Sequence, residues 1–231
     1  MVQTFKRSQI DHCLWHVFSS AGGDVHPTFR ARIKKLLDLD RARAVDPDAR
    51  STMTPGRDRL AFNDDLAGGK GLDVPFTQRH VFRLAVALEL LQAGFKQSEV
   101  MLFVQEVQGQ LDRAYKIMEL NRPGTGKLYI PAQARPGCPT VLGKDGVSLA
   151  DTRVYMLIDR IELPETAPAS LQNMQPILFE PTVFRGIAAL MHALEDRPSD
   201  RRSTLVMEIS ELFALIATHL PDAPVRRRGR P

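Results

Sequence analysis

An α+β fold is predicted for this chain, with a mainly helical N-terminal half that contains a helix-turn-helix and a small α+β C-terminal domain. Through most of the first 120 residues, apolar side chains recur every three or four positions, as on amphipathic helices. Beyond residue 124 the pattern changes to short extended runs, which is typical of strands. We therefore expect a helical domain over 1–122, a small α+β domain over 123–225 and a basic tail over 226–231.

The first two predicted helices are joined by a glycine turn. Residues 6–20 place Ile10, Leu14 and Val17 at helical spacing, and the glycines at 22 and 23 end that helix. Pro27 suits the first position of the next helix, which continues to about residue 43. Two helices joined in this way predict a helix-turn-helix.

Residues 44–75 lose the apolar periodicity and gain Pro, Gly, Asp and Arg. They contain only a short apolar fragment at 60–62 and a glycine-rich turn at 68–71. Both a wing and a long loop fit this composition. A connection of this length is uncommon in a compact domain, which favours a functional role over an inert connector.

Helical periodicity returns at Phe76. Val81, Leu84, Leu88 and Leu91 mark one helix, and Gly94 is placed as its C-terminal stop. A longer helix is expected over 97–120. Its apolar residues alternate spacings of four and three, which predicts either a seam between two subunits or a helix packed on its own domain. The seam residues are Val100, Val104, Val107, Leu111, Ala114 and Met118.

The C-terminal half carries the strand candidates. The clearest one covers 154–163, which begins as a continuous apolar run, and the segment 177–179 is expected to pair with it. Pro181 is predicted to open a helix that continues through Leu194. A strand at 205–209 is then expected to lead into a helix capped by Ser210. Shorter candidates lie at 128–130, 140–142 and 147–149.

Positive charge is concentrated at the end of the chain. The 31 Lys and Arg exceed the 27 Asp and Glu by four, and the tail contributes four arginines, so the rest of the chain is neutral overall. The stretch Arg-Gly-Arg-Pro resembles the AT-hook, which implies insertion into the minor groove of A·T-rich DNA. A polybasic tail that acts only through non-specific attraction is the alternative. The tail residues concerned are Arg226, Arg227, Arg228, Gly229 and Arg230.

The second helix supplies the other candidate DNA contacts. Lysines and arginines on its exposed side would neutralise phosphates, and Arg30 and Lys34 are the leading candidates for contacts to base edges. An ordinary solvated basic face is the alternative. The candidates on this helix are Thr28, Arg30, Arg32, Lys34 and Lys35, and those in the possible wing are Arg57, Arg59 and Lys70.

One stretch of about thirty residues resembles a known family. Phe76, Leu84, Gly94, Phe95 and Val100 follow the pattern of MerR-type DNA-binding domains. In that family an aromatic residue closes a wing, a helix and a Gly-aromatic turn follow, and a long helix pairs two subunits. The resemblance implies a winged helix-turn-helix and a homodimer. The family's opening Arg-Tyr-Tyr-Glu-like stretch is absent here, and Lys96 stands where a serine-type cap is usual.

Other chemistry has less support in the sequence. His12 and His16 share a helix face, as metal ligands can, but no further residues complete a metal site. The two glycine-lysine turns, at 68–71 and 124–127, do not fit a phosphate loop, and no nucleophile elbow is present. Cys13 and Cys138 have no disulfide spacing. We therefore expect no cofactor, no catalytic activity, no membrane span and a cytoplasmic location.

The sequence as a whole predicts a bacterial DNA-binding protein, a transcriptional regulator that binds duplex DNA, with an A·T preference if the tail enters the minor groove. A homodimer is expected. Two alternatives remain. One is an interaction adaptor or nucleoid component whose heptad helix binds a partner, and the other is a small enzyme that uses the N-terminal histidines with a metal.

Overall fold

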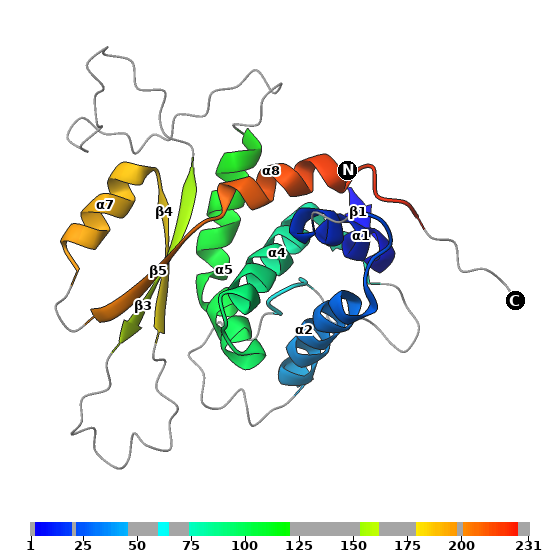
Figure 1. Cartoon of the computed structure of the whole chain (residues 1–231), viewed down its shortest axis with the longest axis horizontal. Coiled ribbons are helices and arrows are strands. Elements are labelled where there is room, and N and C mark those ends of the chain that lie inside the picture. The colour runs from blue at the N-terminus through cyan, green and yellow to red at the C-terminus, as the bar shows by residue number, and fades with distance from the viewer. Residues whose placement is uncertain are drawn as a thin grey trace, which may run out of the picture. The chain divides into compact units, whose positions relative to one another are not determined.

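The computed structural model describes residues 3–19, 22–45, 60–64, 74–120, 153–161, 179–197 and 201–225. Helices make up most of these residues and small antiparallel sheets a smaller part, so the fold is mixed α+β with a helical majority, as the sequence predicted (Figure 1). The chain divides into two compact units. One contains 1–108 and 211–231, and the other contains 109–210.

The first unit is built from helices and one short two-stranded ribbon. The ribbon pairs the start of the chain with the residues before α4, in antiparallel register Thr4↔Thr77 and Phe5↔Phe76. The elements of this unit are β1 (Thr4–Phe5), α1 (Arg7–Phe18), α2 (Pro27–Val45), β2 (Phe76–Thr77), α4 (Gln78–Gln92), the first half of α5 (Gln97–Leu120) and α8 (Ser210–His219).

The helix α4 is the most buried element of the first unit. Every residue from His80 to Leu88 is buried. At its N-terminus the Thr77 hydroxyl accepts from the His80 backbone N–H at 3.4 Å. At its C-terminus Gly94 has a φ of 94°, which favours glycine, and its N–H donates to the Leu91 carbonyl. The prediction that Gly94 ends this helix is therefore confirmed.

Aromatic side chains fix the connection between α1 and α2. The Trp15 indole N–H donates to the Gly22 carbonyl at 3.1 Å. The Trp15 ring lies 6.4 Å from the His26 ring and 5.4 Å from the Phe29 ring, centroid to centroid. These contacts join the end of α1 to the start of α2, so the two helices are connected by ring packing as well as by a hydrogen bond.

The C-terminal helix α8 returns to the first unit. Its Phe213 ring packs edge-on against Phe82 of α4, with 6.3 Å between centroids. Just after the helix, the Ala223 carbonyl accepts from the Gln9 side-chain amide at 3.1 Å. The division therefore differs from the expected ranges 1–122 and 123–225, because the buried side of α8 completes the core of the N-terminal helices.

The second unit contains a three-stranded antiparallel sheet of order β4-β3-β5. Its core joins the sheet to a helix, with Tyr155 and Leu157 of β3 packed against Leu190. The second unit begins with the second half of α5, where the Gln110 side chain accepts from the Val183 N–H of β4 at 2.9 Å. The elements are the second half of α5, β3 (Val154–Ile161), β4 (Phe179–Arg185), α7 (Ile187–Glu195) and β5 (Arg201–Glu208).

The structure differs from two of the sequence predictions. Pro181 does not open a helix; it lies in β4 opposite Ile158, and the helix begins only at Ile187, after Gly186 with a φ of 78°. Proline is tolerated in β4 because that strand is at the edge of the sheet. Ser210 does begin α8, but its hydroxyl accepts from the Val154 N–H and donates to Glu208.

The main strand predictions are confirmed, since β3 covers most of 154–163 and β5 covers most of 205–209. The candidates at 128–130, 140–142 and 147–149 lie outside the described residues. None of the described helices is long and apolar enough to cross a membrane.

Candidate nucleic-acid interface

The outer side of α2 carries a basic face made of Arg32, Lys34, Lys35 and Arg41, which we call the α2 basic face. All four side chains are exposed. The opposite side of the helix is buried through Ile33, Leu36 and Leu37. The apolar residues therefore fix the helix to its unit and leave the cations in solvent.

The spacing of these cations spreads charge over much of the exposed surface. Arg32 and Arg41 are nine residues apart, which corresponds to about 14 Å along the axis and about 180° around it. Lys34 and Lys35 lie between them in sequence. Asp38 is the one acidic residue exposed on the described part of this helix. The face therefore carries a net positive charge, which attracts polyanions.

Arg30, a leading candidate from the sequence, is in a different environment. It is half-buried, and its backbone carbonyl accepts from the Arg7 guanidinium at 3.4 Å. Arg7 also pairs with Asp11 at 2.6 Å. Burial raises the pKa of Asp11, and the charges of Arg7 and Arg30 oppose that rise. Arg30 therefore contributes to a partly buried charge cluster with α1, whereas Lys34 is exposed as expected.

Thr28 lies at the exposed start of α2, next to the aromatic contacts described above. Its backbone N–H donates to the His26 ring nitrogen Nδ1 at 3.3 Å. Both side chains are exposed. The first turn of α2 is therefore accessible, which is the part of a recognition helix that reaches base edges in helix-turn-helix proteins.

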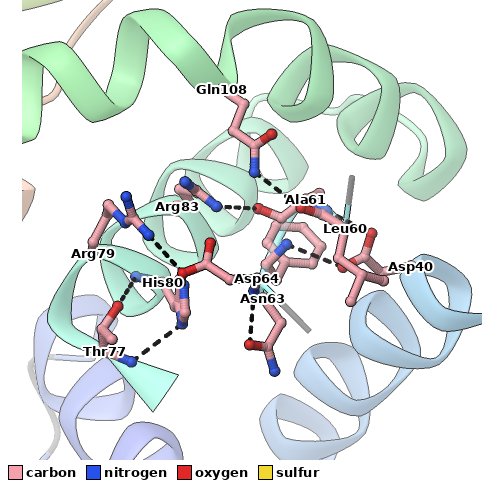
Figure 2. A network of polar contacts seen from close by, with 11 residues as sticks. Asp40, Leu60, Ala61, Asn63, Asp64, Thr77, Arg79, His80, Arg83 and Gln108 are labelled. Carbon is pink, nitrogen blue, oxygen red and sulfur yellow. Dashed lines mark hydrogen bonds and ion pairs between the residues drawn. The ribbon is translucent and has the colours of Figure 1, made fainter. Parts of the chain in front are cut away.

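The inner side of α2 holds a buried carboxylate that binds a separate stretch of backbone. Asp40 accepts from the Ala61 N–H at 2.8 Å and from the Phe62 N–H at 3.0 Å (Figure 2). Asp40 is 2% exposed, and Leu60, Ala61 and Phe62 are also buried. Both oxygens of the carboxylate are thus used to hold this short segment on α2.

Two other helices complete the attachment of residues 60–64, which we call the anchored segment. The Gln108 amide of α5 donates to the Leu60 carbonyl at 2.9 Å. The Arg83 guanidinium of α4 donates to the Ala61 carbonyl at 3.4 Å, and Figure 2 shows both side chains converging on the segment. Backbone groups that would be costly to bury alone are therefore satisfied by side chains from α2, α4 and α5.

At the C-terminal end of the anchored segment, Asp64 makes contacts with two side chains of α4. Asp64 pairs with Arg79 at 2.6 Å, and its carboxylate lies 3.0 Å from Nε2 of His80. The other ring nitrogen of His80, Nδ1, accepts from the Thr77 N–H at 3.2 Å. Since Nδ1 is an acceptor, the neutral ring carries its proton on Nε2, facing Asp64.

The titration of these groups follows from their surroundings. Burial raises the pKa of Asp40, although two N–H donors oppose the rise. Burial likewise lowers the pKa of His80 below its ordinary 6.5, against the opposing effect of Asp64. Partial burial works against ionisation of Asp64, but His80 and Arg79 hold its pKa below the usual value. At neutral pH, His80 is therefore neutral and Asp64 is ionised.

The polar residues that hold the anchored segment carry little signal in the sequence. Asp40 lies in line with the apolar residues of α2, and a carboxylate on an apolar helix side is the one signal that could have indicated a buried partner. Arg83 and Gln108 have no such signal, since each lies on a helix where a solvated polar residue would look the same in sequence.

The remaining candidate residues fall into two groups. The six seam residues of α5 are all buried within the chain, which favours the interpretation of a helix packed on its own protein. The other candidate DNA contacts lie outside the described residues, so the structure gives them no position. These are Arg57, Arg59, Lys70, Arg226, Arg227, Arg228, Gly229 and Arg230.

The N-terminal histidines lie together with one from α8. The ring centroid of His16 is 4.5 Å from that of His12 and 5.8 Å from that of His219. Across the described part of the chain, no group of three or more His, Cys, Asp or Glu residues could hold a metal ion. In comparison with known proteins, no family model matches this chain and no curated protein matches it in sequence.

Proposed function

We propose that this protein is a bacterial, cytoplasmic transcriptional regulator that binds duplex DNA through the α2 basic face. Its role is binding, with no catalytic step. The observation that carries the proposal is a helix with four exposed cations on one side and a buried, hydrogen-bonded opposite side. Such a helix can enter a groove without losing its own packing.

The arrangement of cations suits the major groove. A helix in that groove has a phosphate backbone on each side. Arg32 and Arg41, about 180° apart around the axis, would face the two backbones, with Lys35 between them. Phosphate contacts of this kind fix the register of the protein on the duplex, whereas Thr28 at the open end of α2 would reach base edges.

The rest of the first unit supports the same proposal. The β1–β2 ribbon ties the chain start to α4, and α1 and α2 are joined by a packed turn. The packed α1–α2 pair supports the winged helix-turn-helix that the MerR-type resemblance implies.

The test is fluorescence-anisotropy titration of duplex DNA over a salt series, with the double variant Lys34→Ala, Lys35→Ala. Removing two phosphate contacts should weaken binding at every sequence and reduce the slope of log K against log salt by roughly one to two. The matched control is Arg113→Ala, Lys116→Ala, which removes the same charge from exposed positions on α5. Equal losses in both variants would mean that only net charge matters, and would count against the α2 basic face.

A version ending at Val225 separates the tail from the helix. If the tail enters the minor groove, its removal should abolish any preference for A·T-rich over G·C-rich duplexes, while Lys34 and Lys35 still set the affinity. No binding by the full chain at low salt would remove the DNA-binding proposal. The burial of the described seam residues counts against an adaptor that binds its partner through the α5 seam.

A further inference from the structure

The two edges of the sheet in the second unit differ in how they are protected. On β4, Pro181 lacks an N–H, and the Val183 N–H is taken by Gln110. Natural proteins use such features to prevent pairing at an exposed edge. On the other side, no strand among the described residues lies beyond β5.

The direction of the β5 backbone groups follows from two hydrogen bonds. The Ile209 N–H donates to the Val154 carbonyl at 2.8 Å, so residue 209 faces β3. Backbone groups alternate sides along a strand, and Met207 faces Met156 in the same way. The N–H and C=O groups of Thr204, Val206 and Glu208 therefore point away from β3, toward the open edge.

The composition of β5 leaves this edge available for pairing. From residue 203 to 207 it has no charge and no proline, and Val206 is 40% exposed. The irregular pairing of β5 with β3 lies at the far end, between Ser203 and Arg201. A regular run of β-prone residues, with outward groups that pair with no other strand among the described residues, is a template for an added strand.

We propose that β5 is a homodimer interface, in which the β5 strands of two chains pair antiparallel into one six-stranded sheet. The occupant is a second copy because the strand is self-complementary in charge. It begins with two arginines, at 201 and 202, and ends with Glu208. Antiparallel pairing sets the arginine end against the partner's Glu208, whereas parallel pairing would set like charges together.

Backbone alternation allows only registers that set outward residues opposite one another, and setting Arg202 opposite the partner's Glu208 selects the register with the two-fold axis at Leu205. With the two-fold axis at Leu205, the outward groups of Thr204 meet those of the partner's Val206, and the reverse pair follows by symmetry. Leu205 then faces the partner's Leu205 in a pair without hydrogen bonds. This interface is independent of the proposed DNA binding and replaces the α5 seam as the place where two chains would meet.

The first test is the molar mass of the full chain by light scattering after size exclusion, over a concentration series. The mass should be twice that of one chain. Val206→Lys places a charge at the centre of the edge and should give the monomer. Met191→Lys is the control, since Met191 is also exposed and apolar but lies on α7, and it should leave the dimer intact.

The second test does not depend on disrupting the strand. In a Cys138→Ser background, Leu205→Cys should form a disulfide-linked dimer without reductant, because the Cα atoms of such a pair lie about 4.5 Å apart. Val206→Cys, which faces Thr204 of the partner subunit, should not cross-link to itself. A monomeric full chain, a dimer that survives Val206→Lys, or cross-linking through 206 in place of 205 would each overturn the proposal.

Discussion

Asp40 shows how one residue can organise a loop. A carboxylate that is 2% exposed would normally be unfavourable in an apolar setting. Here its two oxygens receive the N–H groups of Ala61 and Phe62, so the segment gains acceptors that it cannot find in a helix or strand. Asp40 stabilises the anchored segment because its two oxygens accept hydrogen bonds from two adjacent backbone N–H groups.

Replacing Asp40 by alanine should therefore be strongly destabilising. Two buried N–H groups would lose their acceptor, at about 1 to 3 kcal/mol each, so we expect the free energy of unfolding to fall by about 2 to 6 kcal/mol in urea titrations. Asp38→Ala, on the exposed side of the same helix, should change it by no more than about 0.5 kcal/mol. Similar values for both variants would contradict the role given to Asp40.

His80 has a second role at the N-terminus of α4. Its Nδ1 accepts from the Thr77 N–H while its own backbone N–H donates to the Thr77 hydroxyl. This reciprocal arrangement normally uses Glu or Gln at the third helical position. With histidine there, the cap depends on a ring that must stay neutral.

Stability should consequently fall as the pH is lowered through 6.5, the ordinary pKa of histidine. The pKa of folded His80 is below that value, so the unfolded chain binds the proton first, and the free energy of unfolding decreases as pH falls. Above pH 6.5 both states are neutral at this residue and the contribution is fully present. His80→Gln keeps an acceptor for Thr77 and should reduce this pH dependence in denaturant titrations. An unchanged pH slope in that variant would show that other groups cause it.

At the scale of elements, two glycines with different surroundings give a matched comparison. Gly94 ends α4 with a φ of 94°, a conformation that a side chain rarely adopts. Gly109 is inside α5, and a Cβ added there would contact nothing within 4 Å. One glycine is needed for the backbone conformation, whereas the other only lowers the helix propensity.

Alanine at the two positions should therefore have opposite effects. Gly94→Ala should lower the free energy of unfolding by on the order of 1 to 2 kcal/mol, because alanine is strained at positive φ. Gly109→Ala should raise it by up to about 1 kcal/mol. Thermal unfolding followed by circular dichroism measures both. A loss of stability at 109 equal to that at 94 would mean that packing, and not backbone conformation, decides.

At the scale of the whole molecule, the core of the first unit includes a helix from the other end of the chain, α8. Phe213 of α8 is 6% exposed and packs on Phe82. Phe213→Ala should lower the stability of the first unit by about 3 to 5 kcal/mol. Trp15 is the single tryptophan and lies in that unit, so its fluorescence reports the transition. Exposed Met191→Ala is the control and should leave this transition within about 0.5 kcal/mol.

Much of this fold is predictable from local patterns. The bounds of α5 agree with the expected 97–120, and Gly94 ends α4, because periodicity and glycine conformation act within a few residues. The error at Pro181 has a different origin. Proline suits both a helix start and an edge strand, and the choice depends on where β3 lies. The candidate site shows the same contrast. The exposure of Lys34 was predicted from the local pattern of α2, whereas the binding of backbone by Asp40 depends on a distant segment and was not predicted.

The sequence by itself determined most of the helices, the strands β3 and β5, the helical majority of the fold and the charge available for a polyanion, because each follows from spacing or composition along the chain. Only the tertiary structure decided that Asp40 holds the anchored segment, that α8 belongs with the N-terminal helices, that the α5 seam is buried and that β5 is an edge among the described strands. These features depend on contacts between residues far apart in the chain, and no local pattern specifies which distant residue will supply a buried group with its partner.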